Sequence, residues 1–116
     1  MGCVTPLVPP APRQVVFERA ELDQIMQLYG RMVAAGLWRD YAIDLGPRAA
    51  TFSAFRRASE RPEIRLVKDP SLRHRQGQYA LIGETGAVLR RGQDLAAVLA
   101  PARRRLLKLV AEPRTP

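Results

Sequence analysis

The sequence predicts an α+β domain, an antiparallel meander sheet of about five to six strands with two helices on one of its faces. One observation is that apolar residues recur at helical spacing over residues 22–33 and again over residues 95–110. The other is that the stretch between them alternates apolar and polar residues with period two and is divided by short turn sequences. The expected order is a short strand, a helix, a run of strands and a C-terminal helix.

The ends of the chain are predicted to be tails around a single domain. Residues 1–12 contain four prolines, which interrupt both helices and sheet ladders, so we expect a disordered Pro-rich tail there. Residues 13–110 form the single α+β domain, and residues 111–116 are a second disordered tail.

The first strand is predicted at RQVVFE, and the first helix begins directly after it. Glu18 at the cap position and Glu21 three residues later are typical of a helix start. Gly36 indicates the helix end. Gly30 inside the helix costs about 1 kcal/mol relative to Ala, so we expect another element to pack closely there. The apolar stripe of this helix comprises Leu22, Ile25, Met26, Tyr29, Met32 and Val33.

Three hairpins are predicted after this helix. A turn at residues 46–49 pairs Leu45 with Ala50, Ile43 with Phe52 and Tyr41 with Ala54, which we take as large side chains opposite small ones on the inner face. The next hairpin sets Ala54 against Leu66. A further hairpin turns at Gly86, which suits a positive φ. The last helix contains Pro101, which we expect to kink or divide it.

Phe52 and Phe55 are three residues apart, so a strand directs their rings to opposite faces of the sheet. The predicted register places Phe52 in the core and Phe55 on the outward face among arginines. Aromatic residues and Arg are enriched at protein–protein interfaces, although internal cation–π and ion pairs fit the same pattern. The predicted partner surface comprises Trp38, Phe55, Arg57 and Arg65.

Four stretches carry a resemblance to a known family: LYGRMVAAGLWRDYAIDL, FSAFRRASERPEIRL, GQYAL and RRGQDLAAVL. Over roughly residues 14–100 the chain resembles the alphaproteobacterial domain-of-unknown-function family 2794. The resemblance implies a bacterial cytoplasmic protein with a single domain. The resemblance brings no assigned activity, cofactor or set of catalytic residues with it.

The net charge of +8 arises entirely from the second half of the chain. Residues 1–50 hold five basic and five acidic residues, whereas residues 51–116 hold fourteen basic and six acidic ones, a difference of eight. Such asymmetry favours an acidic partner, either nucleic acid or an anionic protein. An abundance of Arg, Ala, Pro and Gly through codon bias is the competing explanation.

Two groups of basic residues are candidate anion sites. The predicted register makes Arg39 and Arg56 cross-strand neighbours, and like charges placed opposite each other require an anion. That anion is either a carboxylate of the same domain or a phosphate or acidic group of a partner. The second group is a basic face of the last helix, either solvated or bound to nucleic acid, formed by Arg103, Arg104, Arg105 and Lys108.

Catalytic and metal-binding patterns are not found in the sequence. His74 is the one histidine and Cys3 the one cysteine, and the Ser and Gly residues match neither a nucleophile elbow nor a phosphate-binding loop. We therefore expect no enzymatic activity, no cofactor, no metal, no small-molecule substrate and no membrane span. The expected function is that of a cytoplasmic binding or regulatory module with a protein partner or a second copy of itself. Nucleic-acid binding through the basic second half is the alternative.

Overall fold

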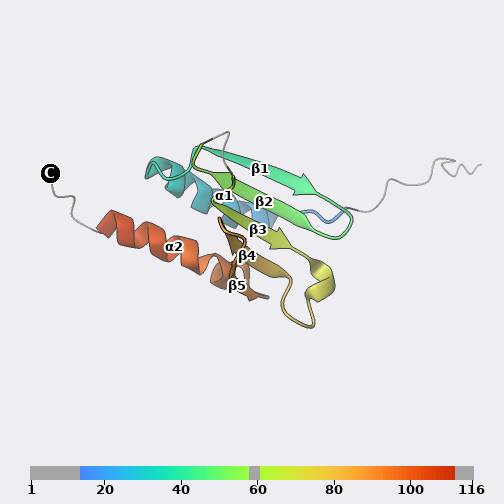
Figure 1. Cartoon of the computed structure of the whole chain (residues 1–116). Helices are drawn as coiled ribbons and strands as arrows, with labels where there is room; N and C mark the ends of the chain where they lie inside the picture. Colours follow the sequence, from blue (N-terminus) through green and yellow to red (C-terminus); the bar gives the residue numbers. More distant parts are fainter. Residues whose placement is uncertain (1–13, 58–60, 112–116) are drawn as a thin grey trace, which may run out of the picture.

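The computed structural model describes residues 14–57 and 61–111. The elements follow one another in the order shown in Figure 1. They are α1 (Arg19–Ala34), β1 (Asp40–Leu45), β2 (Ala50–Phe55), β3 (Ile64–Lys68), a 3₁₀ turn (Pro70–Leu72), β4 (Tyr79–Gly83), β5 (Val88–Gly92) and α2 (Leu95–Ala111). The predicted tails lie outside the described residues, apart from Ala111, which belongs to α2.

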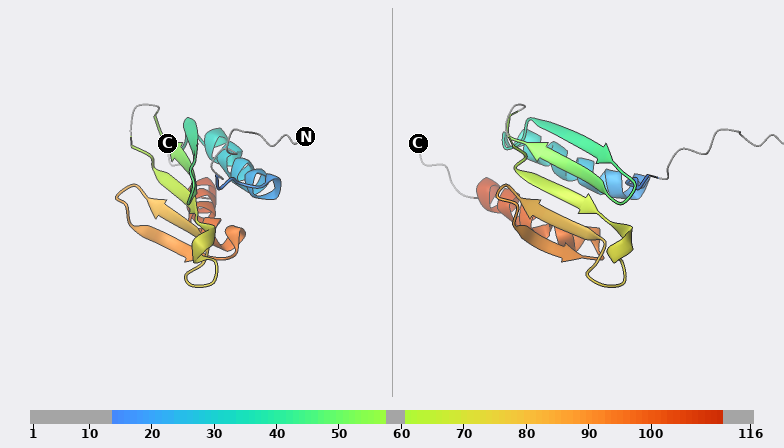
Figure 2. Two further views of the ribbon diagram at one scale, coloured as in Figure 1. Left: turned by 90° about the vertical axis from the view of Figure 1, so that its right-hand side faces the viewer. Right: turned by 45° about the vertical axis from the view of Figure 1, so that its right-hand side comes forward.

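The five strands form one antiparallel sheet in the order β1-β2-β3-β4-β5, so each strand pairs with its neighbours along the chain. Both helices pack on the same face of this sheet, α1 behind β1 and β2 and α2 against β4 and β5 (Figures 1 and 2). The prediction of an α+β meander with its helices on one face is thereby confirmed.

The predicted first strand is wrong. Of RQVVFE, residues 14–18 form no ladder, and α1 therefore precedes the first strand of the sheet. The Val15 amide donates to the Gly46 carbonyl in the β1–β2 turn at 2.8 Å. The carbonyl of Val16 accepts a hydrogen bond from a side chain, the Lys68 ammonium, at 2.9 Å. The segment is thus held by separate contacts rather than by strand pairing.

The predicted boundaries of α1 are confirmed. Glu18 is the N-cap, and its amide donates to the Glu21 carboxylate at 2.6 Å. Gly36 has a φ of 78°, and the Leu37 amide returns to the Met32 carbonyl at 2.9 Å, which closes the helix end. The expected close packing at Gly30 is wrong, because Gly30 is exposed and a Cβ built on it meets nothing within 4 Å.

The β1–β2 register agrees with the prediction: Ile43 pairs with Phe52 and Tyr41 pairs with Ala54. The β2–β3 register differs by two residues, because Phe52 rather than Ala54 lies opposite Leu66. A shift of two preserves the face of every side chain. Helix α2 continues through Pro101, so the proline does not divide it. The core consists of inner-face side chains of the sheet, among them Phe52, Leu66 and Leu81, packed against side chains of both helices. The helix side chains include Ile25, Met32, Val98 and Leu99.

Two glycines meet where the loop before β4 passes the end of β5. Gly77 has a φ of 96°, and a Cβ built on it lies 2.4 Å from the carbonyl carbon of Gly92. Backbone cannot yield as the tip of a side chain can, and this φ is unfavourable for any residue with a Cβ. Both the positive φ and the lack of room for a Cβ therefore require glycine at position 77.

Gly77→Ala is expected to lower the free energy of unfolding by about 2 kcal/mol or more, because it combines a clash with a disfavoured φ. Gly30→Ala is the matched control, and it should raise that free energy by about 0.5–1 kcal/mol in an exposed helical position. Urea denaturation of the two variants measures both effects. Equal stabilities for the two variants would contradict the described geometry.

Candidate functional site

The candidate site is the face of the sheet opposite the helices, here called the outer face. Phe52, Leu66 and Leu81 are buried beneath the helices, so alternate residues of the same strands point to the other side. No described helix covers these residues (Figure 2). The outer face carries Phe55, Arg65, Val67, Ile82, Val88 and Arg91 as its largest side chains.

Phe55 lies on this face as the sequence predicts. It is half-buried and lies opposite Asp40 in the β1–β2 ladder. Arg65 is exposed and pairs with Ser53 on one side and Ile82 on the other, which makes it a diagonal rather than a direct neighbour of Phe55. An aromatic ring, an aliphatic side chain and a guanidinium therefore share one part of the surface.

Charge changes sign across the outer face. Asp40 and Asp44 lie on β1, whereas Arg65 lies on β3 and Arg91 on β5. Val67 and Ile82, both half-buried, lie on the strands between the acidic and basic margins. Arg65 shares the middle of this face with Val67 and Ile82, and such a mixture of Arg and apolar side chains is typical of a protein interface rather than of a phosphate-binding surface.

The predicted outward position of Trp38 is wrong. Trp38 is 1% exposed, and its indole Nε1–H donates to the Glu63 carboxylate at 2.8 Å. Its ring lies 6.0 Å from that of Tyr29 on α1. Strand alternation does not apply to Trp38, because β1 begins two residues later at Asp40. Trp38 therefore belongs to the core and not to the partner surface.

Glu63 joins several segments at the start of β3. It is buried and forms an ion pair with Arg105 of α2 in addition to its bond from Trp38. Its second oxygen lies 3.4 Å from Nε of Arg56, and Arg56 also reaches Glu84 at 3.1 Å. A buried carboxylate requires such partners, since an isolated charge inside a protein is strongly unfavourable.

These ion pairs bear on the predicted Arg39–Arg56 anion clamp. Arg56 obtains its anions inside the domain, from Glu63 and Glu84, which is the structural alternative of that prediction. Among the described residues, no carboxylate pairs with both Arg39 and Arg56. Arg39 instead donates its backbone amide to the Phe55 carbonyl at 2.8 Å. Arg56 is thus paired inside the domain, and the clamp of Arg39 and Arg56 on an external anion stays a prediction.

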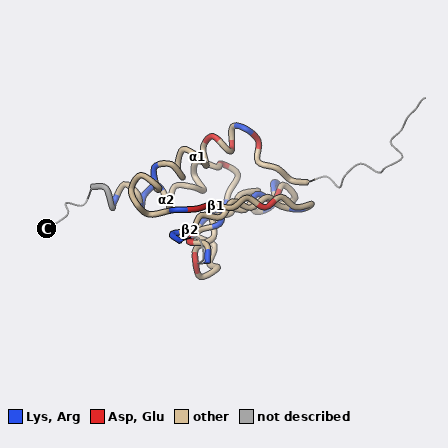
Figure 3. Tube along the Cα trace, turned by 90° about the horizontal axis from the view of Figure 1, so that it is seen from above, with Lys and Arg blue, Asp and Glu red and all other residues tan. Residues whose placement is uncertain are grey.

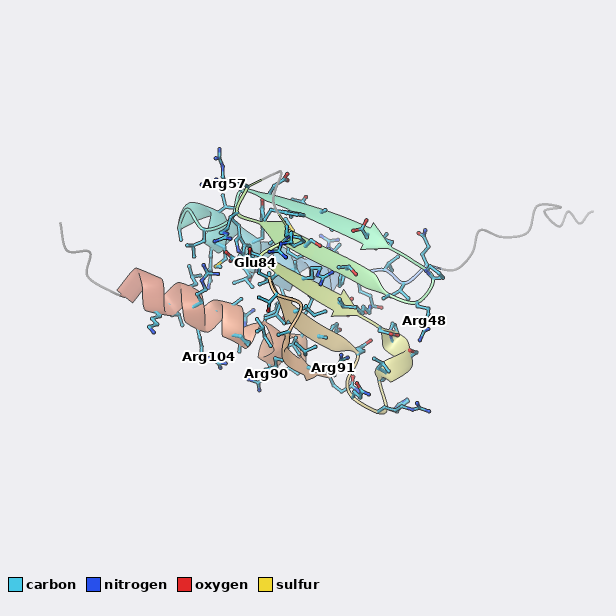
Figure 4. The ribbon with its side chains drawn as sticks, viewed as in Figure 1. Arg48, Arg57, Glu84, Arg90, Arg91 and Arg104 are labelled. Atoms are coloured by element: carbon cyan, nitrogen blue, oxygen red, sulfur yellow. The ribbon has the colours of Figure 1, made fainter. Side chains whose placement is uncertain are left out.

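The predicted basic face of α2 is divided. Arg105 is engaged with Glu63, and Arg103 is half-buried beside Arg31 in a groove between the helices. Arg104 and Lys108 are exposed. Helix α2 contains four basic residues and no acidic one, whereas both kinds occur elsewhere along the described trace (Figure 3). Arg57, also predicted for the partner surface, is exposed beyond the end of β2 (Figure 4).

A pocket of about 350 Å³ lies beside Glu63, between α2 and the β4–β5 turn. Its apolar lining comes from Trp38, Leu81, Leu89 and Pro101, among others. Two arginines and two glutamates line its rim, so their charges compensate one another; they are Arg56, Arg105, Glu63 and Glu84. This pocket is not predicted from the sequence, because its lining residues come from segments far apart in the chain.

A second buried carboxylate, Glu21, lies at the opposite end of β3. It accepts hydrogen bonds from the Lys68 ammonium at 2.7 Å and from the Tyr79 hydroxyl. Burial acts to raise the pKa of Glu21, but the bonds from Lys68, Tyr79 and the Glu18 amide hold that pKa below its ordinary value. Burial and the Glu21 carboxylate raise the pKa of the Tyr79 phenol. The hydroxyl of Tyr79 therefore stays protonated as a donor.

Within the described residues, no helix is long and apolar enough to cross a membrane. The same part of the chain contains no group of three His, Cys, Asp or Glu residues placed to hold a metal ion.

Comparison with protein families gives one match: residues 15–99 match the family described as protein of unknown function (DUF2794), and the chain belongs to this family. Comparisons with curated proteins and with solved structures found no match. The family description names no ligand or activity, so function has to be argued from the site itself.

The Glu21 carboxylate makes the stability dependent on pH. The pKa of Glu21 in the folded protein lies below the ordinary value of 4.5. Its contribution to the free energy of unfolding is therefore fully present above pH 4.5 and is lost as the pH falls through the folded pKa. Glu21→Gln removes the charge but nearly keeps the shape. The melting temperature of the variant should lie below that of the wild type near neutral pH, and the gap should narrow in acid.

Thermal melts of both proteins from neutral pH down to below 4.5 check this expectation. Asp23→Asn is the control, because Asp23 is an exposed acid on the same helix. A gap for Glu21→Gln that stays constant across the pH range would show that the Glu21 carboxylate does not have the described contacts.

Proposed function

We propose that the chain is a non-enzymatic cytoplasmic binding module that takes a protein partner on its outer face. One observation carries this proposal: both helices cover the same side of the sheet and leave Phe55, Arg65 and Ile82 on the other. Aromatic and Arg side chains contribute disproportionately to binding energy at protein interfaces. The outer face offers both within reach of half-buried aliphatic residues.

The buried charged groups support a structural rather than a catalytic role for the interior. Glu21 is engaged by Lys68 and Tyr79, and Glu63 is engaged by Trp38 and Arg105. Each of these groups ties one segment of the fold to another. Recognition by the exposed surface is therefore the function that the described side chains support best.

The preferred partner carries an acidic group opposite Arg65 and apolar groups opposite Phe55 and Ile82. A protein surface provides this combination. Phosphates of nucleic acid are disfavoured on this face, because Asp40 and Asp44 lie along its β1 margin and repel them.

Arg65→Glu and Phe55→Ser should each abolish capture of the partner by the immobilised chain from a nuclease-treated lysate of its native cells. Arg65 is exposed, so its replacement should leave the melting temperature nearly unchanged. Phe55 is half-buried, so its replacement should lower the free energy of unfolding by about 1 kcal/mol. Arg73→Glu is the matched control, since Arg73 is an exposed arginine after the 3₁₀ turn and belongs to none of the strands. Capture that survives both outer-face substitutions would contradict the proposal.

Nucleic-acid binding is the second candidate, and one observation favours it. Helix α2 packs beside β5, which brings the exposed Arg104 to the same side of the molecule as Arg90 and Arg91 (Figure 4). Fluorescence anisotropy with labelled RNA and DNA should then show binding that weakens steeply as salt is added. Arg104→Glu should weaken it, and Arg73→Glu should not. An unchanged anisotropy at low salt would exclude this candidate.

A further inference from the structure

Strand β1 is a free edge of the sheet with apolar side chains in solvent. No described element lies beyond it (Figures 1 and 2). Tyr41, Ile43 and Leu45 are 42%, 38% and 40% exposed although they point to the same face as the buried core residues of β2. The ring of Tyr41 stacks on Phe52 at 5.6 Å and meets that of Tyr29 on α1 edge-on at 4.9 Å, and Tyr41 still keeps this exposure. The apolar inner face of the sheet thus extends to the edge strand, where its side chains are partly exposed to solvent.

The backbone groups on this edge belong to the same three residues. The Gly46 amide donates to Ala49 at 3.0 Å, and the bonds of an antiparallel ladder alternate along each strand. Asp44 and Ala42 therefore direct their amides and carbonyls to β2, whereas Tyr41, Ile43 and Leu45 direct theirs away from the sheet. The Tyr41 amide donates to the Asp40 carboxylate at 2.8 Å, so an incoming strand would meet the backbone groups of Ile43 and Leu45, the Tyr41 carbonyl and the apolar side chains.

The other edge of the sheet differs in the features that normally prevent strand pairing. Strand β5 carries the adjacent charges Arg90 and Arg91, and its ladder with β4 contains an irregularity between Leu81 and Ile82. Charged residues and bulges protect edge strands from pairing with other chains. In contrast, β1 has six regularly paired residues with no Lys, Arg or Pro, and its two acids both lie on the outer face.

We propose that two copies of the chain pair through β1, antiparallel about a two-fold axis at Ile43, and so join their five-stranded sheets into one. On the inner face, Ile43 lies opposite Ile43 of the second copy and Tyr41 lies opposite Leu45. On the outer face, Asp44 lies opposite Ala42 and Asp40 lies opposite Gly46. Every inner pair is apolar, and no acid faces another acid.

Charge selects this register from those that the edge allows. Shifting the axis to Ala42 places Asp40 opposite Asp44, and shifting it to Asp44 places that residue opposite its own copy. Like charges directly opposite each other destabilise a sheet. Axes at Tyr41 or Leu45 avoid the repulsion but shorten the overlap of the two strands. The register about Ile43 alone combines full overlap with separated acids.

This pairing is independent of the proposed partner surface. A two-fold axis perpendicular to the sheet keeps the helices of both copies on one side and both outer faces on the other. Loss of self-association and loss of partner capture are therefore separate results. The substitutions that test them lie on different residues.

Light scattering after size exclusion tests the self-association. The full chain should have a mass of about 26 kDa, twice its 13.0 kDa, at micromolar concentration. Ile43→Lys should give the monomer mass, because two ammonium groups then meet at the axis. Val88→Lys is the matched control on the opposite edge, where Val88 is 50% exposed, and it should remain dimeric. A monomeric wild type at high micromolar concentration would overturn the proposal.

Cysteine cross-linking tests the register in a Cys3→Ser background. Ala42→Cys and Asp44→Cys are both exposed, so neither substitution disturbs the core. The register about Ile43 brings residue 42 of one copy within about 4.5 Å (Cα to Cα) of residue 44 of the other, within the range of a disulfide. A mixture of the two variants should cross-link under mild oxidation, and each variant alone should not. Cross-linking of either variant with itself, or none in the mixture, would overturn the proposed pairing.

Discussion

Two buried carboxylates, Glu21 and Glu63, hold the helices against one face of the sheet. Glu21 of α1 is joined to Lys68 at the end of β3, and Glu63 at the start of β3 is joined to Arg105 of α2. Removing one partner of a buried ion pair leaves an uncompensated charge, so each pair restricts where its helix can pack. The one-sided arrangement of the domain depends on these two contacts together with the apolar inner face.

The same arrangement determines which surfaces remain for recognition. With both helices behind the sheet, Phe55 and Arg65 on the outer face and the free edge at Ile43 are left exposed or half-buried. The outer face is mixed apolar and basic, which fits a protein partner, whereas the edge is apolar and directs backbone groups away from the sheet, which fits a second copy of the same strand. A small domain in this way presents two different surfaces.

The sequence was most informative where local periodicity decides the structure. The boundaries of α1, the turn at residues 46–49 and the opposite orientations of Phe52 and Phe55 all follow from period and spacing. Trp38 was misplaced because it precedes β1, where alternation gives no orientation and the bond to Glu63 decides it. The stretch RQVVFE has the composition of a strand but lies where the sheet offers it no ladder. The ion pairs of Glu63 join residues far apart in the chain, which no spacing rule can relate.

Hydroxyl-radical footprinting tests the central claim that the outer face is the partner surface, because it reports the solvent exposure of individual side chains. In the isolated chain, Phe55 should be oxidised faster than the buried Phe52, and Trp38 should be protected despite the high reactivity of indoles. After the partner has bound, Phe55 and Ile82 should become protected while the exposed Leu107 on α2 remains reactive. Unchanged oxidation of Phe55 in the complex, with protection appearing on α2 instead, would contradict the claim.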